Sequence, residues 1–147
     1  MTELAAITLE RHAKKVWKHV TDYGFVAEDT VIPLVGAELA KTVPVMPTGF
    51  MKLEAGYQLV AITSLQPGTN LYVAPDGKWL TEYIPAALRT HPFQLAQQEG
   101  AGEFILCINE ASGLVVENTE DGNAFFDDQD QPTQGIKDIL NVLSQIK

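Results

Sequence analysis

Hydrophobic positions near the end of the chain repeat with the period of a helix. Five apolar residues follow an i, i+3, i+4, i+7, i+10 spacing: Ile136, Ile139, Leu140, Leu143 and Ile146. This spacing places all of them in one stripe along a helix. Thr133, which follows Pro132, can cap its first turn. The pattern predicts a helix over residues 133–147.

A second helix is predicted over residues 29–41. Val31, Val35 and Leu39 repeat at four-residue spacing, and Asp29 can cap the first turn. Pro33 is compatible with this prediction because the first N–H groups of a helix have no partner inside it.

Between these helices, short apolar runs alternate with turns rich in glycine and proline. Residues 49–53 and 57–62 flank a hairpin-length connection, and so do residues 93–97 and 103–109. Shorter strands are predicted at 70–74, 114–116 and 124–126, and a short helix within 79–89. We therefore expect an α+β fold with a mainly antiparallel sheet of about five to seven short strands.

The length of 147 residues and the 46% apolar content fit a single domain over residues 1–147. No apolar run approaches the roughly 18–20 residues of a membrane helix, so no membrane span is expected. The first residues lack the basic and apolar regions of a signal peptide, so a cytoplasmic location is expected. The one cysteine, Cys107, lies in an apolar run and is interpreted as a buried, inert thiol.

The net charge of −9 lies in one part of the chain. Residues 90–136 hold nine acids and no lysine or arginine. An excess of this sign argues against nucleic acid as a partner. It indicates either a solubilising surface or a docking face for a basic partner. The basic residues within 8–20 are expected to lie against this acidic part of their own chain.

The sequence holds no recognisable catalytic or cofactor motif. It has no nucleophile elbow, no Walker loop and no dinucleotide fingerprint, so no cofactor is expected. The three histidines (His12, His19 and His91) are too scattered to predict a metal site. Adjacent carboxylates at Asp127 and Asp128 would face opposite sides of a strand and could not act on one bond.

The most unusual block runs from residue 70 to residue 93. It combines aromatic and positively charged side chains of the kind found at interaction hot spots. The candidate ligand-binding or partner-binding residues are Asn70, Trp79, Tyr83, Arg89 and His91. The alternative is a packed connection whose aromatic rings fill the core with their polar ends outward. No residue is assigned a catalytic role.

The run LQPGTNLYVAPDGKWLTEYIPAALRTHPF, residues 65–93, resembles the characteristic segment of the SapC family. The resemblance extends to residues 10–12, 23–27, 33–38, 106–114 and 125–127, with Asn109 where the family usually has Asp. Family members continue well beyond a helix such as 133–147. The chain is therefore interpreted as a shortened member or as the N-terminal portion of a longer one.

The resemblance implies a bacterial protein linked to surface-layer protein export or attachment. Our leading hypothesis is a non-enzymatic binding or accessory protein with a protein partner. The alternative is an accessory protein, small-molecule carrier or enzyme that acts with a flavin-dependent halogenase-like or cupin-like oxygenase system. Self-association through the apolar stripe of the C-terminal helix also stays open.

Overall fold

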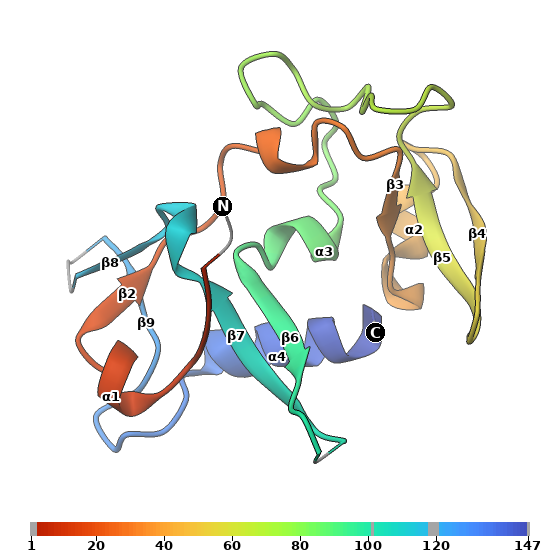
Figure 1. Cartoon of the computed structure of the whole chain (residues 1–147). Helices are drawn as coiled ribbons and strands as arrows, with labels where there is room; N and C mark the ends of the chain where they lie inside the picture. The colour runs from red at the N-terminus through yellow and green to blue at the C-terminus, as the bar shows by residue number, and fades with distance from the viewer. Residues whose placement is uncertain (1–2, 101, 118–120, 147) are drawn as a thin grey trace. The chain divides into compact units, whose positions relative to one another are not determined.

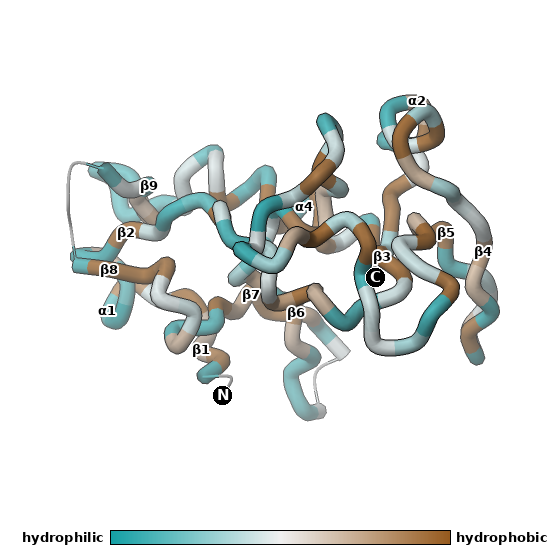
Figure 2. The backbone as a smooth tube through the Cα atoms, turned by 90° about the horizontal axis from the view of Figure 1, so that it is seen from above, coloured by the Kyte–Doolittle hydropathy of each residue, from teal (hydrophilic) through white to brown (hydrophobic). Residues whose placement is uncertain are grey.

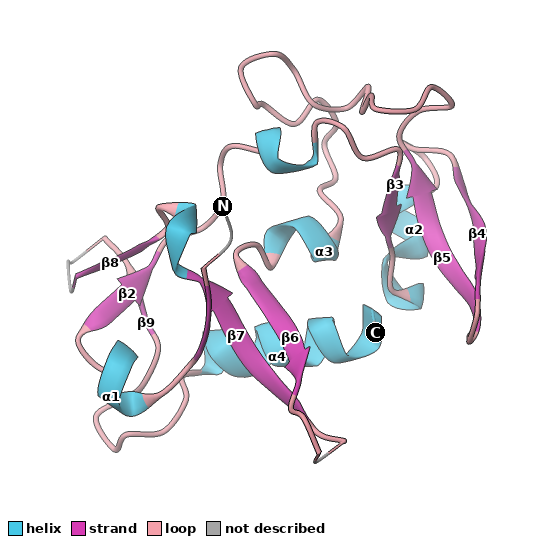
Figure 3. Ribbon diagram, viewed as in Figure 1, coloured by secondary structure: helices cyan, strands magenta, loops and turns pink. Residues whose placement is uncertain are grey.

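The computed structural model describes residues 3–100, 102–117 and 121–146. The chain divides into two compact units. The first is built from residues 1–19 and 90–145, and the second from residues 20–89. Figure 1 labels the elements, and Figure 3 distinguishes helices, strands and loops.

The first unit contains two antiparallel sheets of three strands each. In the first sheet the order is β1-β7-β6, with β1 (Leu4–Ala6), β7 (Phe104–Asn109) and β6 (Phe93–Gln97). In the second sheet the order is β8-β2-β9, with β8 (Val115–Glu117), β2 (Lys15–Trp17) and β9 (Asn123–Ala124). The helices of this unit are α1 (Leu9–His12) and α4 (Gln134–Ile146), and a 3₁₀ turn covers Glu110–Ser112.

The core of the first unit lies between α4 and the strands. Its buried side chains are Trp17, Phe93, Ile108, Phe125, Ile136 and Ile139. Ile136 and Ile139 bring the predicted apolar stripe of α4 into this core, and Leu143 packs against it from the same stripe. The hydrophobic segments of β8 and of the β6–β7 hairpin are brown in Figure 2. Burial of this stripe is the main reason that α4 is stable, because isolated helices of this length are marginal in water.

The second unit is organised around one antiparallel sheet of order β3-β5-β4. Its strands are β3 (Val31–Pro33), β5 (Gly56–Ile62) and β4 (Thr48–Leu53). Its helices are α2 (Leu39–Thr42) and α3 (Ala86–Arg89), with 3₁₀ turns at Gly24–Val26 and Gly36–Glu38. The long connection between β5 and α3 forms turns instead of strands, apart from a β-bridge between Val73 and Trp79.

The predicted α+β class and antiparallel pairing are confirmed. Both predicted hairpins form, as β4–β5 and β6–β7, and α4 covers the predicted C-terminal helix. The number and grouping of the strands differ from the prediction. The described residues form nine strands in three small sheets, where one sheet of five to seven strands was expected.

Two local predictions are wrong. The expected helix over residues 29–41 begins as strand β3, and only residues 36–42 are helical, as a 3₁₀ turn followed by α2. Pro33 fits this arrangement because it lies at the end of an edge strand, where it opposes Val60 of β5. The expected strand at residues 70–74 is replaced by turns around the single β-bridge.

Candidate functional site

The structure brings three of the five predicted site residues into one network. Trp79, Tyr83 and Arg89 are linked by hydrogen bonds and ring contacts in the second unit. Asn70 lies in the same unit, whereas His91 belongs to the first unit.

Trp79 is a buried anchor that fixes the turn before Tyr83. Its indole Nε1–H donates to the Thr81 hydroxyl at 2.8 Å and to the Tyr83 carbonyl at 3.0 Å. Its ring stacks on Tyr72 and lies tilted against Tyr23, with centroid distances of 5.9 and 5.8 Å. The indole is thus used for packing and for holding a local turn.

Glu38, which the sequence analysis did not select, accepts hydrogen bonds from this network. Its carboxylate is only 5% exposed and accepts the backbone N–H of Val35 at 2.8 Å through Oε2. Its Oε1 accepts the Tyr83 hydroxyl at 2.8 Å and the Ala86 N–H at 2.9 Å. These three bonds satisfy a carboxylate that would otherwise be costly to bury.

The Tyr83 hydroxyl is therefore used in a structural hydrogen bond to Glu38. Burial raises the pKa of its phenol, and the adjacent Glu38 carboxylate raises it further. A phenol that donates to a carboxylate and has a raised pKa is a poor proton acceptor at neutral pH. The geometry therefore gives Tyr83 a positioning role.

Arg89 is exposed yet held in one orientation. Its Nε donates to the Ile84 carbonyl at 3.0 Å, and its Nη2 lies 3.4 Å from the Tyr83 hydroxyl. The guanidinium carbon lies 5.8 Å from the centroid of the Tyr83 ring, a cation–π distance. Among the described residues no carboxylate forms an ion pair with Arg89. Two of its five N–H donors are engaged by these contacts, and the described residues supply no carboxylate for the others.

Asn70 is a structural residue of the loop that follows β5. It is buried, its side-chain amide donates to the Val26 carbonyl at 3.0 Å, and its carbonyl oxygen accepts the N–H of Tyr72 at 2.9 Å. An open depression of about 470 Å³ borders it, together with Asp22 and Gly77. Both ends of the amide are occupied, so Asn70 orders this loop.

His91 is half-buried in the first unit, and burial lowers the pKa of its imidazole. It has an interaction partner of its own. Cys107, in the same unit, is buried, and burial raises the pKa of its thiol, which keeps it protonated at neutral pH. The prediction of a buried Cys107 is confirmed.

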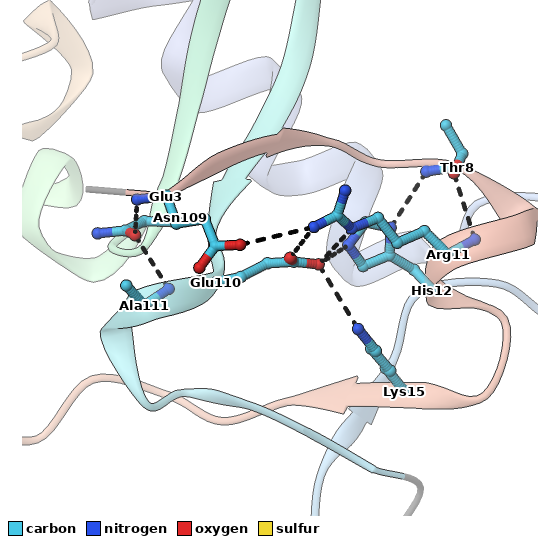
Figure 4. Close-up of polar contacts among 8 residues, drawn as sticks. All are labelled: Glu3, Thr8, Arg11, His12, Lys15, Asn109, Glu110 and Ala111. Carbon is cyan, nitrogen blue, oxygen red and sulfur yellow. Dashed lines mark hydrogen bonds and ion pairs between the residues drawn. The ribbon is translucent and has the colours of Figure 1, made fainter. Parts of the chain in front are cut away.

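A second polar cluster, in the first unit, surrounds Glu110 (Figure 4). Its carboxylate accepts two hydrogen bonds from Arg11, one of them from Nε at 2.9 Å. Lys15 Nζ lies 3.6 Å from Oε1, and His12 Nε2 lies 3.1 Å from the same oxygen. Arg11 holds the pKa of Glu110 below its ordinary value, and the Lys15 ammonium lowers it further. This confirms the expectation that the basic segment lies against the acidic part of the chain.

His12 is fully buried, with an exposed fraction of 0%, and packs on Phe125 at a centroid distance of 5.0 Å. Its Nδ1 accepts the backbone N–H of Thr8 at 3.2 Å, which places the ring proton on Nε2 for donation to Glu110. Burial lowers the pKa of the imidazole more than Glu110 raises it. With both nitrogens occupied, His12 has no free atom with which to take a proton from a substrate.

The β4–β5 hairpin adds an exposed aromatic surface that the sequence analysis missed. Phe50 and Tyr57 are 74% and 72% exposed. They share one face of the hairpin, because the cross-strand pairs Phe50–Leu59 and Lys52–Tyr57 are two positions apart. The alternation of side chains along the two predicted strands is enough to place both residues on one face of the hairpin. It does not show that this face is exposed.

No three histidine, cysteine or carboxylate side chains of the described ranges gather as metal ligands. Within those ranges no helix combines the length and the apolar character of a membrane span.

A protein-family model described as SapC matches residues 7–147, which include both units and both polar clusters. No curated protein and no solved structure matches the chain.

Proposed function

We propose, starting from the fact that the chain belongs to the SapC family, that it is a non-enzymatic binding or accessory protein with a protein partner. Arg89 is the residue proposed to contact an anionic group of that partner. Because the family match runs through both units, we further propose that the two units form one SapC-like domain.

A difference between the two arginines of the chain carries this proposal. Arg11 is exposed in part, but its guanidinium is already engaged by Glu110 and lies 3.9 Å from Glu3. Arg89 is oriented by the Ile84 carbonyl and the Tyr83 ring, without a carboxylate from the described residues. A guanidinium that is already oriented loses little conformational entropy when it binds a carboxylate.

The surroundings of Arg89 support a binding role. Trp79 binds the Tyr83 carbonyl, and the Tyr83 hydroxyl contacts the Arg89 guanidinium. Tryptophan, tyrosine and arginine are the residue types enriched at interaction hot spots. The exposed Phe50 and Tyr57 on the β4–β5 hairpin of the same unit add apolar area of the kind that partners cover.

The two polar clusters support an enzymatic function less well than a binding function. A catalytic acid or base needs an atom that can exchange a proton with a bound substrate. The side chains of Glu38, Tyr83 and His12 are all occupied by internal hydrogen bonds. This is why a binding role is preferred over an enzyme that acts with an oxygenase or halogenase system.

A link to surface-layer protein export or attachment, and a location in the cytoplasm, are parts of the proposal that rest on the family and on the sequence. They make the partner an exported bacterial protein or a component of its export machinery. The acidic residues at 90–136 then serve mainly as a solubilising surface.

The test is affinity capture from cells of the source organism with the immobilised full chain. Proteins retained by the wild type are compared with those retained by Arg89→Ala and Arg89→Lys. We expect at least one partner to be lost from both variants, since the lysine ammonium lacks the planar fork of a guanidinium.

Lys41→Ala is the matched control, because Lys41 is another exposed cation of the second unit. It should retain every partner of the wild type. The proposal fails if folded Arg89→Ala and Arg89→Lys proteins capture the same set of partners as the wild type.

A further inference from the structure

The two ring nitrogens of His12 have partners of opposite kind (Figure 4). Nδ1 accepts the backbone N–H of Thr8 at 3.2 Å, and Nε2 donates to the Glu110 carboxylate at 3.1 Å. The ring is fully buried, so water cannot replace either partner while the surrounding segments stay in place. A second proton on the ring must therefore be accommodated by these two contacts.

Protonation of His12 would strengthen one of these contacts and break the other. In an imidazolium both nitrogens carry a proton and both are donors. The bond from Nε2 to Glu110 then joins two opposite charges, which makes it stronger. The new proton on Nδ1 would point at the Thr8 N–H, so two donors would face each other and that hydrogen bond would be lost.

The charged groups that face His12 come from three elements. Glu110 belongs to the turn after β7, Lys15 of β2 lies 3.6 Å from the same Glu110 oxygen, and Arg11 of α1 binds the same carboxylate. Phe125, which packs on the imidazole, is uncharged. Because Arg11 lowers the pKa of Glu110, this carboxylate stays ionised at the pH at which an imidazolium forms. The imidazolium therefore has a charged acceptor inside the folded unit.

Thr8 lies at the junction between β1 and α1, where a lost bond has a local effect. Its hydroxyl caps the first turn of α1. The preceding residue, Ile7, donates its N–H to the Leu106 carbonyl at 3.1 Å, which keeps the end of β1 attached to β7. Thr8 also lines an apolar depression of about 420 Å³ that residues of α4 border from the other side. Release of Thr8 would thus change α1 and the wall of this depression without opening the sheet.

We propose that His12 is a pH switch, in which protonation of the imidazole releases Thr8 and the first turn of α1 while Glu110 holds the ring in place. Burial lowers the pKa of the imidazole, so the change lies below the ordinary value of about 6.5. The switch lies in the first unit and does not use Arg89, so it goes beyond the function proposed above, and its failure would leave that proposal unaffected.

The test is nuclear magnetic resonance of the full chain, labelled with ¹⁵N, from about pH 7.5 to about pH 5. The ¹⁵N shift of His12 Nδ1 reports protonation of the ring, and hydrogen exchange reports the protection of each amide. We expect the protection of the Thr8 amide to fall about tenfold or more with the midpoint of the ring titration. The protection of Ile108, in the central strand β7, should change by less than about twofold.

Two variants with the same substitution identify the titrating group. In His12→Asn the side-chain oxygen can accept the Thr8 N–H but does not titrate, so the protection of Thr8 should stay constant over this range. His91→Asn is the matched control, because His91 is another histidine of the first unit whose pKa is lowered by burial. Its Thr8 amide should respond to pH like that of the wild type.

A Thr8 amide that stays protected while Nδ1 takes up its proton would overturn the proposal. Equal losses of protection at Thr8 and Ile108 would also overturn it, because the whole unit would then unfold. So would a loss that persists in His12→Asn or disappears in His91→Asn, since another group would then control it. If a variant does not fold, the comparison of Thr8 with Nδ1 and Ile108 in the wild type decides alone.

Discussion

The imidazole of His12 and the carboxylate of Glu110 lie 98 residues apart in the sequence and meet at 3.1 Å between Nε2 and Oε1. Their contact joins the segment of α1 to the turn that follows β7. Because His12 is fully buried and Glu110 also holds Arg11 and Lys15, this pair ties the N-terminal segment to the turn after β7 within the first unit.

Replacing Glu110 tests how much this junction contributes to stability. Glu110→Gln removes the charge that faces Arg11, His12 and Lys15, and leaves Arg11 with only the more distant Glu3 carboxylate at 3.9 Å. We expect the free energy of unfolding to fall by about 1–3 kcal/mol, discounted toward the lower value because Arg11 is half exposed. Denaturant unfolding of the full chain measures the change.

The control for this substitution is Glu117→Gln, in the same unit. Glu117 pairs in register with Lys15 across β2 and β8, but it is exposed. Its substitution should change the free energy of unfolding by less than about 0.5 kcal/mol. Equal effects of the two substitutions would show that Glu110 has no special structural role.

The buried His12 predicts a pH dependence of stability. Its pKa is lowered in the folded chain, so the unfolded chain takes up a proton first as the pH falls through about 6.5. The folded state therefore loses stability from that pH downward, until the pH reaches the lowered pKa of the folded imidazole.

His12→Asn isolates this contribution from the other titrating groups. The difference in free energy of unfolding between wild type and His12→Asn should shrink as the pH falls from about 7.5 to about 5. Denaturant unfolding at several pH values measures it. A difference that is constant or grows over this range contradicts the assignment of a buried, neutral His12.

Two glycines of the second unit allow the effect of backbone strain on stability to be measured apart from the effect of a steric clash. Gly77 and Gly68 both have positive φ angles, +86° and +75°. A Cβ on Gly77 would lie 2.1 Å from Oδ1 of Asp22, whereas one on Gly68 would meet nothing within 4 Å. Gly68→Ala should cost about 1 kcal/mol of stability, and Gly77→Ala at least about 2 kcal/mol. Similar losses in thermal or denaturant unfolding would argue against the close approach of Asp22 to Gly77.

Local pattern predicted the hairpins and the C-terminal helix because short connections and a regular apolar period leave few alternatives. The β4–β5 and β6–β7 pairs and the stripe of α4 are examples. The helix expected over residues 29–41 was wrong in its first part because pairing of Val31, Ile32 and Pro33 with β5 outweighs the helical spacing of Val31, Val35 and Leu39.

The candidate site was predicted only in part, for a physical reason. Trp79, Tyr83 and Arg89 lie within eleven positions of one another, so their contact follows from local turns. Glu38 meets Tyr83 across 45 positions, and nothing in its local sequence shows that distant partner. Charge alone indicated that the basic segment lies against the acidic region, but it could not select Glu110 as the residue at the contact.

The most direct test of a binding role for Arg89 compares the two arginines in one nuclear magnetic resonance spectrum. The full chain gives two arginine Nε–H signals, from Arg11 and Arg89, and single Lys substitutions assign them. Sodium acetate, titrated at constant ionic strength, serves as the carboxylate probe. We predict a saturable shift of the Arg89 signal and an unchanged Arg11 signal, because Glu110 already occupies Arg11. An unchanged Arg89 signal, or equal shifts of both signals, would contradict the role assigned to Arg89.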